Sequence, residues 1–242
     1  MPRKTNPAAV CGMLGAALLI GAVQNVSGAG APPLFPPDGR ETIASRLKQV
    51  GAQTRARWKP FFDAKGIAYP PRKILLVGLK AEHRLQIYAP DSGQKWQLVR
   101  SMPIVAISGN LGPKLRQGDR QVPEGVYTIE SLNPNSRYWL SLRVGYPSTE
   151  DRVQAHRDGR KNLGGDIMIH GSNQSAGCLA MGDAGAQDLF VLAADTLNTP
   201  IEVLLCPLDF RLSDVTPNTN RPSWIDARYA RLREMLKRLP PD

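Results

Sequence analysis

Short apolar or alternating runs, separated by turn residues, fill the middle of the chain. Such runs are typical of β-strands, because side chains alternate between the two faces of a sheet. Strand–helix–strand alternation is lacking, so the pattern favours a mostly β (β-rich α+β) domain with a mixed or antiparallel sheet over a doubly wound fold. The predicted strands cover residues 74–79, 84–88, 96–99, 104–107, 126–132, 138–144, 166–169 and 201–205.

Three other segments have apolar residues at helical spacing. The first covers residues 41–58 and is predicted to end before Pro60. Asp183 is predicted to cap a second helix, which follows Cys178, and Ser223 to cap a third.

The third helix is amphipathic. It has apolar residues at Ile225, Tyr229, Leu232, Leu236 and Leu239, and basic residues at Arg228, Arg231, Arg233, Lys237 and Arg238. This pattern predicts packing on the main domain with a solvated basic face. The alternative is contact of that face with an anionic membrane or wall surface.

The N-terminus predicts export from the cytoplasm. Arg3 and Lys4 precede an uncharged stretch over residues 8–23, and small residues follow at 27–31. A short apolar stretch followed by small residues is typical of a cleaved signal peptide. We therefore expect a signal over residues 1–31 and a periplasmic protein, with an uncleaved inner-membrane anchor as the alternative.

Changes in composition predict the remaining boundaries. Prolines crowd the segment after the signal, so residues 32–70 are expected to form a linker and the N-terminal helix. The β pattern closes near Pro207, which gives one main domain over residues 71–207. Residues 208–242 are then a C-terminal helical extension.

Composition and charge narrow the classes of partner. The 242 residues are 42% hydrophobic and 21% charged, as in ordinary globular proteins, and their net charge is +10. A basic exported protein can meet anionic wall polymers, lipid headgroups or nucleic acid. The basic residues are scattered and have no interleaved aromatic residues, so we expect no nucleic-acid partner.

The few cysteines exclude several architectures. A disulfide-dense scaffold, a four-cysteine zinc site and a ferredoxin-type cluster all need more than Cys11, Cys178 and Cys206. Cys206 could pair with Cys178 in an oxidising compartment, or it could be a buried packing residue. His156, Asp166 and His170 lack a recognised zinc spacing, so we expect neither a metal ion nor a cofactor.

Residues 167–183, IMIHGSNQSAGCLAMGD, hold the components of a thiol active site. His170 ends a predicted strand, a polar loop follows, and Gly177 and Cys178 precede a predicted helix. A histidine near a thiol can take its proton, and a glycine lets backbone N–H groups turn toward a developing oxyanion. A helix N-terminus would also favour the thiolate. Alternatively, an isolated cysteine is a small buried apolar residue.

At these residues the chain resembles the L,D-transpeptidase catalytic domain family, also called YkuD-like, which uses a His-Gly and a Ser-X-Gly-Cys motif. The likeness covers roughly residues 73–205. Residues 110–152 are similar to the YafK-like murein L,D-transpeptidase subgroup, with Gly-Pro-Lys, Pro-Glu-Gly, Asn-Pro-Asn-Ser-Arg-Tyr and Gly-Tyr-Pro stretches in order. Many family members have a second histidine where this chain has Ala176, and a longer loop before the cysteine. Both departures recur in the subgroup.

The resemblance implies an enzyme whose cysteine attacks the amide after the diaminopimelate of a peptidoglycan stem peptide and forms a thioester. Cys178 is then the nucleophile and His170 the general base and acid. The N–H groups of Gly177 and Cys178 become oxyanion donors, and Ser175 and Gly171 shape the loop. An amine resolves the thioester in transpeptidation, and water does so in hydrolysis.

Two alternatives remain open. One is a hydrolase that cleaves the bond between peptidoglycan and a covalently attached outer-membrane lipoprotein, an activity associated with the subgroup. The other is a peptidoglycan-binding module that keeps the fold without turnover.

The subgroup-like stretch adds candidate substrate-binding residues. Arg137, Tyr138 and Tyr146 lie in it, and an arginine could bind a stem-peptide carboxylate through a bidentate contact, or all three could be surface or packing residues. Asp151 and Arg152 are expected to form a local ion pair that orders a loop.

Overall fold

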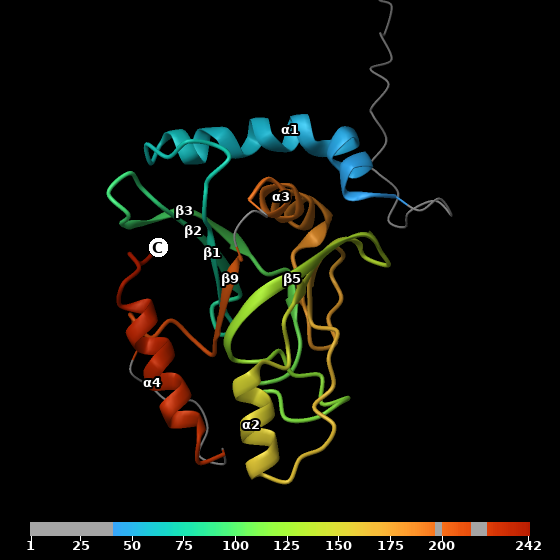
Figure 1. The fold of residues 1–242 in the computed structure, drawn as a ribbon, viewed down its shortest axis with the longest axis vertical. Coiled ribbons are helices and arrows are strands. Elements are labelled where there is room, and N and C mark those ends of the chain that lie inside the picture. The colour runs from blue at the N-terminus through green and yellow to red at the C-terminus, as the bar shows by residue number, and fades with distance from the viewer. Residues whose placement is uncertain (1–40, 197–199, 214–221) are drawn as a thin grey trace, which may run out of the picture. The chain divides into compact units, whose positions relative to one another are not determined.

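The computed structural model describes residues 41–196, 200–213 and 222–242, so the predicted signal over residues 1–31 lies outside the described residues. Within these ranges the chain forms one nine-stranded sheet and four helices (Figure 1). The helices are α1 (Ile43–Asp63), α2 (Thr149–Arg157), α3 (Gly182–Asp195) and α4 (Ile225–Leu236). The strands are β1 (Leu75–Leu79), β2 (Arg84–Pro90), β3 (Trp96–Pro103), β4 (Ala106–Ile107), β5 (Gly125–Ser136), β6 (Trp139–Val144), β7 (Met168–His170), β8 (Leu179–Ala180) and β9 (Glu202–Cys206).

The sheet is mixed, with strand order β3-β2-β1-β9-β5-β6-β7-β8-β4. β1 pairs with β9 and β7 with β8 in parallel, and the other neighbours are antiparallel. The sequence-based prediction of a β-rich α+β fold with a mixed sheet and flanking helices is therefore confirmed. β3 and β4 stand at opposite ends of this order, yet only Ile104 and Val105 separate them in the chain. One segment thus forms both ends of the sheet.

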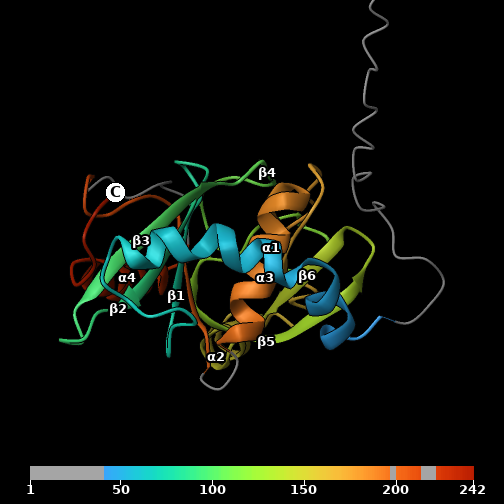
Figure 2. The same cartoon turned by 90° about the horizontal axis from the view of Figure 1, so that it is seen from above.

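Two apolar clusters hold helices against the two faces of the sheet. On one face α1 and α3 contribute Trp58, Phe62 and Phe190 to the larger cluster. On the other, alternate residues of β1 and β9 pack against α4 (Figures 1 and 2). All five apolar positions of the predicted helix, Ile225, Tyr229, Leu232, Leu236 and Leu239, are buried there, although α4 itself ends at Leu236. The amphipathic pattern therefore correctly predicted which side of α4 packs on the sheet.

Several element boundaries differ from the predictions. Pro60 lies inside α1, which continues to Asp63, because Trp58 and Phe62 are both buried and anchor the last turns. Residues 133–136 belong to β5, so the chain turns after Ser136 and not within them. Ser223 does not cap α4, whose N-cap residue is Trp224.

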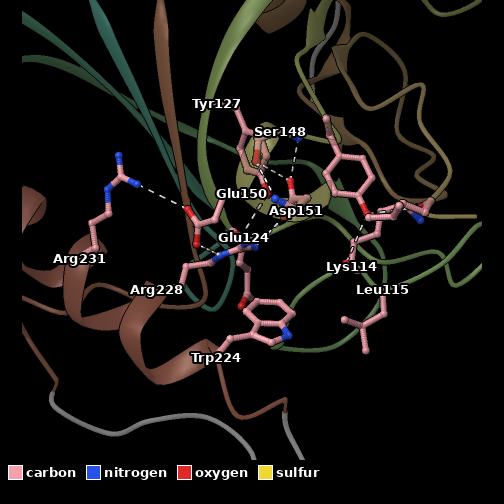
Figure 3. A network of polar contacts seen from close by, with 12 residues as sticks. Lys114, Leu115, Glu124, Tyr127, Ser148, Glu150, Asp151, Trp224, Arg228 and Arg231 are labelled. Carbon is pink, nitrogen blue, oxygen red and sulfur yellow. Dashed lines mark hydrogen bonds and ion pairs between the residues drawn. The ribbon is translucent and has the colours of Figure 1, made fainter. Parts of the chain in front are cut away.

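Helix α2 was not predicted, because its sequence has almost no apolar periodicity. A capping box starts it, in which Ser148 and Asp151 exchange hydrogen bonds between side chain and backbone. Asp151 is buried and forms an ion pair with Arg228 of α4 at 2.8 Å, so the predicted local pair with Arg152 is wrong (Figure 3).

Arg228 correspondingly leaves the predicted solvated face of α4. Its side chain is 3% exposed and donates hydrogen bonds to Glu150, Asp151 and the Glu124 carbonyl. Arg231, Lys237 and Arg238 remain exposed. None of the helices in residues 41–196, 200–213 and 222–242 is long and apolar enough to cross a membrane.

Candidate active site

Strands β7 and β8 bring His170 and Cys178 together. The strands are parallel and His170 is in register with Ala180, so Cys178, two residues before Ala180, points to the same face as His170. The offset along the strands is two residues, or about 7 Å. The sheet therefore places the two predicted catalytic side chains on one surface, with His170 at the end of β7 and Cys178 directly before β8.

His170 is held in one tautomer. Its side chain is buried, and Nδ1 lies 2.5 Å from the carbonyl oxygen of Gly171. A carbonyl oxygen only accepts, so Nδ1 carries the proton and Nε2 is the basic nitrogen. Burial lowers the pKa of His170, against a smaller opposing effect of the Gly171 hydrogen bond. The imidazole is therefore neutral near pH 7.

Cys178 is half-buried and protonated at rest. Burial raises the pKa of the Cys178 thiol, and this outweighs the lowering by the Met168 backbone and by Lys114. Sγ lies 3.6 Å from the carbonyl oxygen of Asp166. The helix that was predicted to follow Cys178 does not begin next to it, because β8 and Met181 separate Cys178 from α3. The resting pair is thus thiol and neutral imidazole.

A serine pair holds the two peptide units on either side of the Gly177–Cys178 peptide. Ser175 Oγ donates to the Cys178 carbonyl at 2.7 Å, and Gly177 N–H donates to Ser108 Oγ at 2.6 Å. The two serine oxygens lie 3.1 Å apart. Because Ser108 already accepts from Gly177 N–H, that N–H is not free to face an oxyanion as predicted. Gly177 itself has φ +105° and a Cβ there would lie 3.3 Å from the Gln121 carbonyl, so glycine is required.

Sequence reasoning missed Ser108 entirely. It follows β4, which pairs with β8, and this pairing sets Ser108 beside Cys178 although they are far apart in the chain. The predicted role of Asp183 as the cap of α3 is wrong. The Asp183 carboxylate accepts the N–H of Ser172 at 2.7 Å and holds the loop after His170.

Comparison with known proteins decides the family. Residues 72–203 match the L,D-transpeptidase catalytic domain, YkuD. The chain belongs to this family. It is 32% identical to the L,D-transpeptidase YafK of Escherichia coli strain K12 over 167 residues, which are 67% of this chain and 61% of YafK. The chain thus spans about three fifths of the curated relative's length.

Solved structures give a weaker likeness. The helical cell shape determining protein Pgp2 of Campylobacter jejuni aligns with a TM-score of 0.46 at 16% identity, over 82% of this chain and 78% of Pgp2. Bd1075 of Bdellovibrio bacteriovorus aligns with a TM-score of 0.41 at 17% identity, over 69% and 55%.

Within this L,D-transpeptidase domain, the three predicted substrate-binding residues lie in different surroundings. Arg137 is exposed, and Tyr138 is half-buried with its ring stacked on His170 at 4.8 Å between centroids. Tyr146 is only 4% exposed, and its hydroxyl donates to the carbonyls of Lys114 and Leu163. Tyr146 is therefore inaccessible to a substrate and joins two loops.

The remaining polar candidates form no site. Cys206 is buried in the cluster under α4, and both Cys178 and Cys206 are free thiols. His156 lies on α2 and is exposed, away from His170 in β7. Among the residues that the structure describes, no three His, Cys, Asp or Glu side chains gather as a metal-binding set.

Proposed function

We propose that this L,D-transpeptidase family member is a periplasmic cysteine acyltransferase that acts at the diaminopimelate of peptidoglycan stem peptides. The proposal is supported by the register of β7 and β8, which sets His170 and the residue before β8, Cys178, on one face of the sheet, with Nε2 of His170 as the basic nitrogen. Membership of the family and the identity with YafK support peptidoglycan as the substrate.

The acylation step follows from the resting pair. His170 Nε2 takes the thiol proton while Sγ bonds to the carbonyl carbon of the scissile amide. As the C–N bond breaks, His170 returns that proton to the leaving amine, and a thioester remains on Cys178. An incoming amine or water reverses these roles and regenerates the thiol.

The Cys178 N–H is the proposed oxyanion donor. The neighbouring Gly177 N–H is bonded to Ser108, and Ser175 fixes the Cys178 carbonyl. A peptide whose two neighbouring peptide units are held in place can keep its N–H directed toward the position where negative charge develops. Ser108 and Ser175 therefore act by positioning this donor.

Product analysis tests the proposal. Wild type and Cys178→Ala are incubated with tetrapeptide muropeptides and with lipoprotein-linked sacculi, and products are identified by mass spectrometry. Loss of terminal alanine with an amine joined at the diaminopimelate indicates transpeptidation, and water added at that position indicates hydrolysis. Release of lipoprotein peptide indicates the amidase alternative. Absence of any Cys178-dependent product overturns the enzymatic proposal and favours a binding module.

A further inference from the structure

The tip of the β5–β6 hairpin covers the imidazole of His170. Tyr138 lies at this tip, and its ring stacks on His170 with an interplanar angle of 25°. Its carbonyl also accepts the N–H of Gly171 at 3.0 Å, and Gly171 in turn accepts from His170 Nδ1. Tyr138 thus meets the histidine from two directions, through its ring and through the backbone.

Gly171 makes this close approach sterically feasible. A Cβ at Gly171 would lie 2.6 Å from the Tyr138 carbonyl oxygen and 3.2 Å from Cβ of Trp139. Neither atom can move without shifting the hairpin, because one is a backbone oxygen and the other is bonded directly to the backbone. The predicted loop role of Gly171 therefore has a steric cause: it lets the hairpin tip press against the His170–Gly171 unit.

The hairpin tip is itself held by the start of α1. Glu41 N–H donates to Asn135 Oδ1 at 2.9 Å, and Asn135 Nδ2 donates to the Glu41 carbonyl at 2.7 Å. Arg46, which is 2% exposed, donates from Nε to the Pro134 carbonyl at 3.0 Å. In Figures 1 and 2 the blue end of α1 lies beside this hairpin.

Arg46 also stacks on the residue next to Tyr138. Its guanidinium lies 4.7 Å from the ring centroid of Trp139, a residue with φ +71° and 2% exposure. A left-handed backbone at a bulky residue is unfavourable unless its surroundings enforce it. The contacts from α1 supply that enforcement at the turn that carries Tyr138.

We propose that Tyr138 is a positioning residue for His170, and that the first turns of α1 hold it there through Asn135, Arg46 and Trp139. A hydrogen bond at Nδ1 alone leaves the imidazole able to tilt about that bond. The stacked Tyr138 ring removes this freedom, so Nε2 stays directed toward the reacting centre. The inference rests on the proposed role of His170 as the base.

The charged and titratable groups around His170 come from several elements. Arg137 lies over the Tyr138 ring on the hairpin, Asp183 is on α3, and Cys178 precedes β8. The Asp183 carboxylate is already bonded to Ser172 N–H. Tyr138 therefore acts on His170 by excluding water and fixing the ring, and the burial that lowers the pKa of His170 is consistent with this.

The test compares Tyr138→Leu, which removes the ring, with Tyr138→Phe, which keeps it. The two readouts are kcat and KM on muropeptides, and the His170 pKa measured by NMR in a Cys178→Ala background. We expect Tyr138→Leu to lower kcat about tenfold with KM little changed, because positioning contributes to the chemical step. The His170 pKa should rise toward its usual value. Tyr138→Phe should retain both properties.

Two further variants separate positioning from folding. Tyr69→Leu removes an aromatic ring that meets Phe62 of α1 edge-on and a hydroxyl that donates to Asp195 at the C-terminal end of α3. It should lower the melting temperature without moving either readout. Arg46→Ala should shift both readouts in the direction of Tyr138→Leu. Wild-type values in Tyr138→Leu, or equal losses in Tyr138→Phe, overturn the proposal. The NMR titration needs no turnover, so it stays informative if the proposed acyl transfer fails.

Discussion

At the scale of single residues, the site is a neutral pair. Burial lowers the pKa of His170 and raises the pKa of Cys178. An ion pair of thiolate and imidazolium would require the opposite shifts. In the proposed acylation step, proton transfer to His170 would therefore accompany attack on the substrate and not precede it.

This protonation state predicts a pH profile for Cys178. Because the thiol pKa is raised, the rate of alkylation by iodoacetamide should climb steadily above neutral pH, with its midpoint above the usual value for a cysteine. His170, with its lowered pKa, stays neutral as the pH falls below about 6.5, so the acid limb of kcat/KM should lie below that pH. A plateau of alkylation between about pH 5 and 8 would indicate a preformed thiolate and contradict the neutral pair.

Ser108 provides a second prediction at this scale. Ser108→Ala leaves Gly177 N–H without its partner, and an unpaired buried donor costs about 1–3 kcal/mol. We expect kcat to fall about tenfold, because the peptide unit before the one that contains Cys178 N–H loosens and no longer holds that N–H in place. Ser92→Ala, in the β2–β3 turn, serves as the control. A rise in kcat would instead identify Gly177 N–H as the oxyanion donor.

The residues that the sequence could identify are those adjacent in the motif. His170 and Cys178 stand eight positions apart, and their types and order define the thiol site. Ser108 and Tyr138 reach the same place from β4 and the β5–β6 hairpin. No local sequence pattern predicts such contacts, because they depend on strand register across the sheet.

At the scale of elements, helix α2 shows what periodicity cannot detect. Its buried residues are Asp151 and Ala155, so it has no apolar face. What holds it is the ion pair between Asp151 and Arg228 of α4 (Figure 3). The capping box at Ser148 was the available signal. Helices α3 and α4, which bury apolar faces, were predicted correctly in all but their caps.

Arg228 therefore supplies a stability prediction. Arg228→Ala leaves the Asp151 carboxylate buried without its cation, which should lower the free energy of unfolding by about 3–5 kcal/mol. Arg231→Ala removes a side chain that is 60% exposed and should change it by less than about 0.5 kcal/mol. Urea denaturation of both variants measures the difference. Equal effects would show that the buried contact contributes no more than the surface one.

At the scale of the whole molecule, buried polar contacts connect α4 to the loop beside the active site. Glu124, from the Pro-Glu-Gly stretch, accepts from Lys80 at 2.7 Å and from Gly112 N–H at 2.7 Å. Tyr229 of α4 donates to the same carboxylate. In the sequence, the Pro-Glu-Gly stretch stands out only by its resemblance to the family. Its physical role depends on β1 and α4, which are distant in the chain.

The two apolar clusters should consequently unfold together. Leu232→Ala on α4 and Phe62→Ala on α1 each remove a fully buried side chain, from opposite faces of the sheet. Each should cost about 2–5 kcal/mol and shift one shared cooperative transition. Thermal unfolding followed by far-UV circular dichroism and by tryptophan fluorescence checks this. Separate transitions in the two signals would mean that α4 melts independently.

The single segment that forms both ends of the sheet bears on self-association. Exposed sheet edges act as templates on which a second chain can add strands, and long flat edges lead to aggregates. Here the end at β4 is two residues long, and Val105, just before it, already donates its N–H to Ala180. The end at β3 carries Arg100 and finishes at Pro103. The β4 end therefore offers other copies of the protein little backbone to pair with, and strand addition along the eight-residue β3 is limited where that strand finishes at a proline.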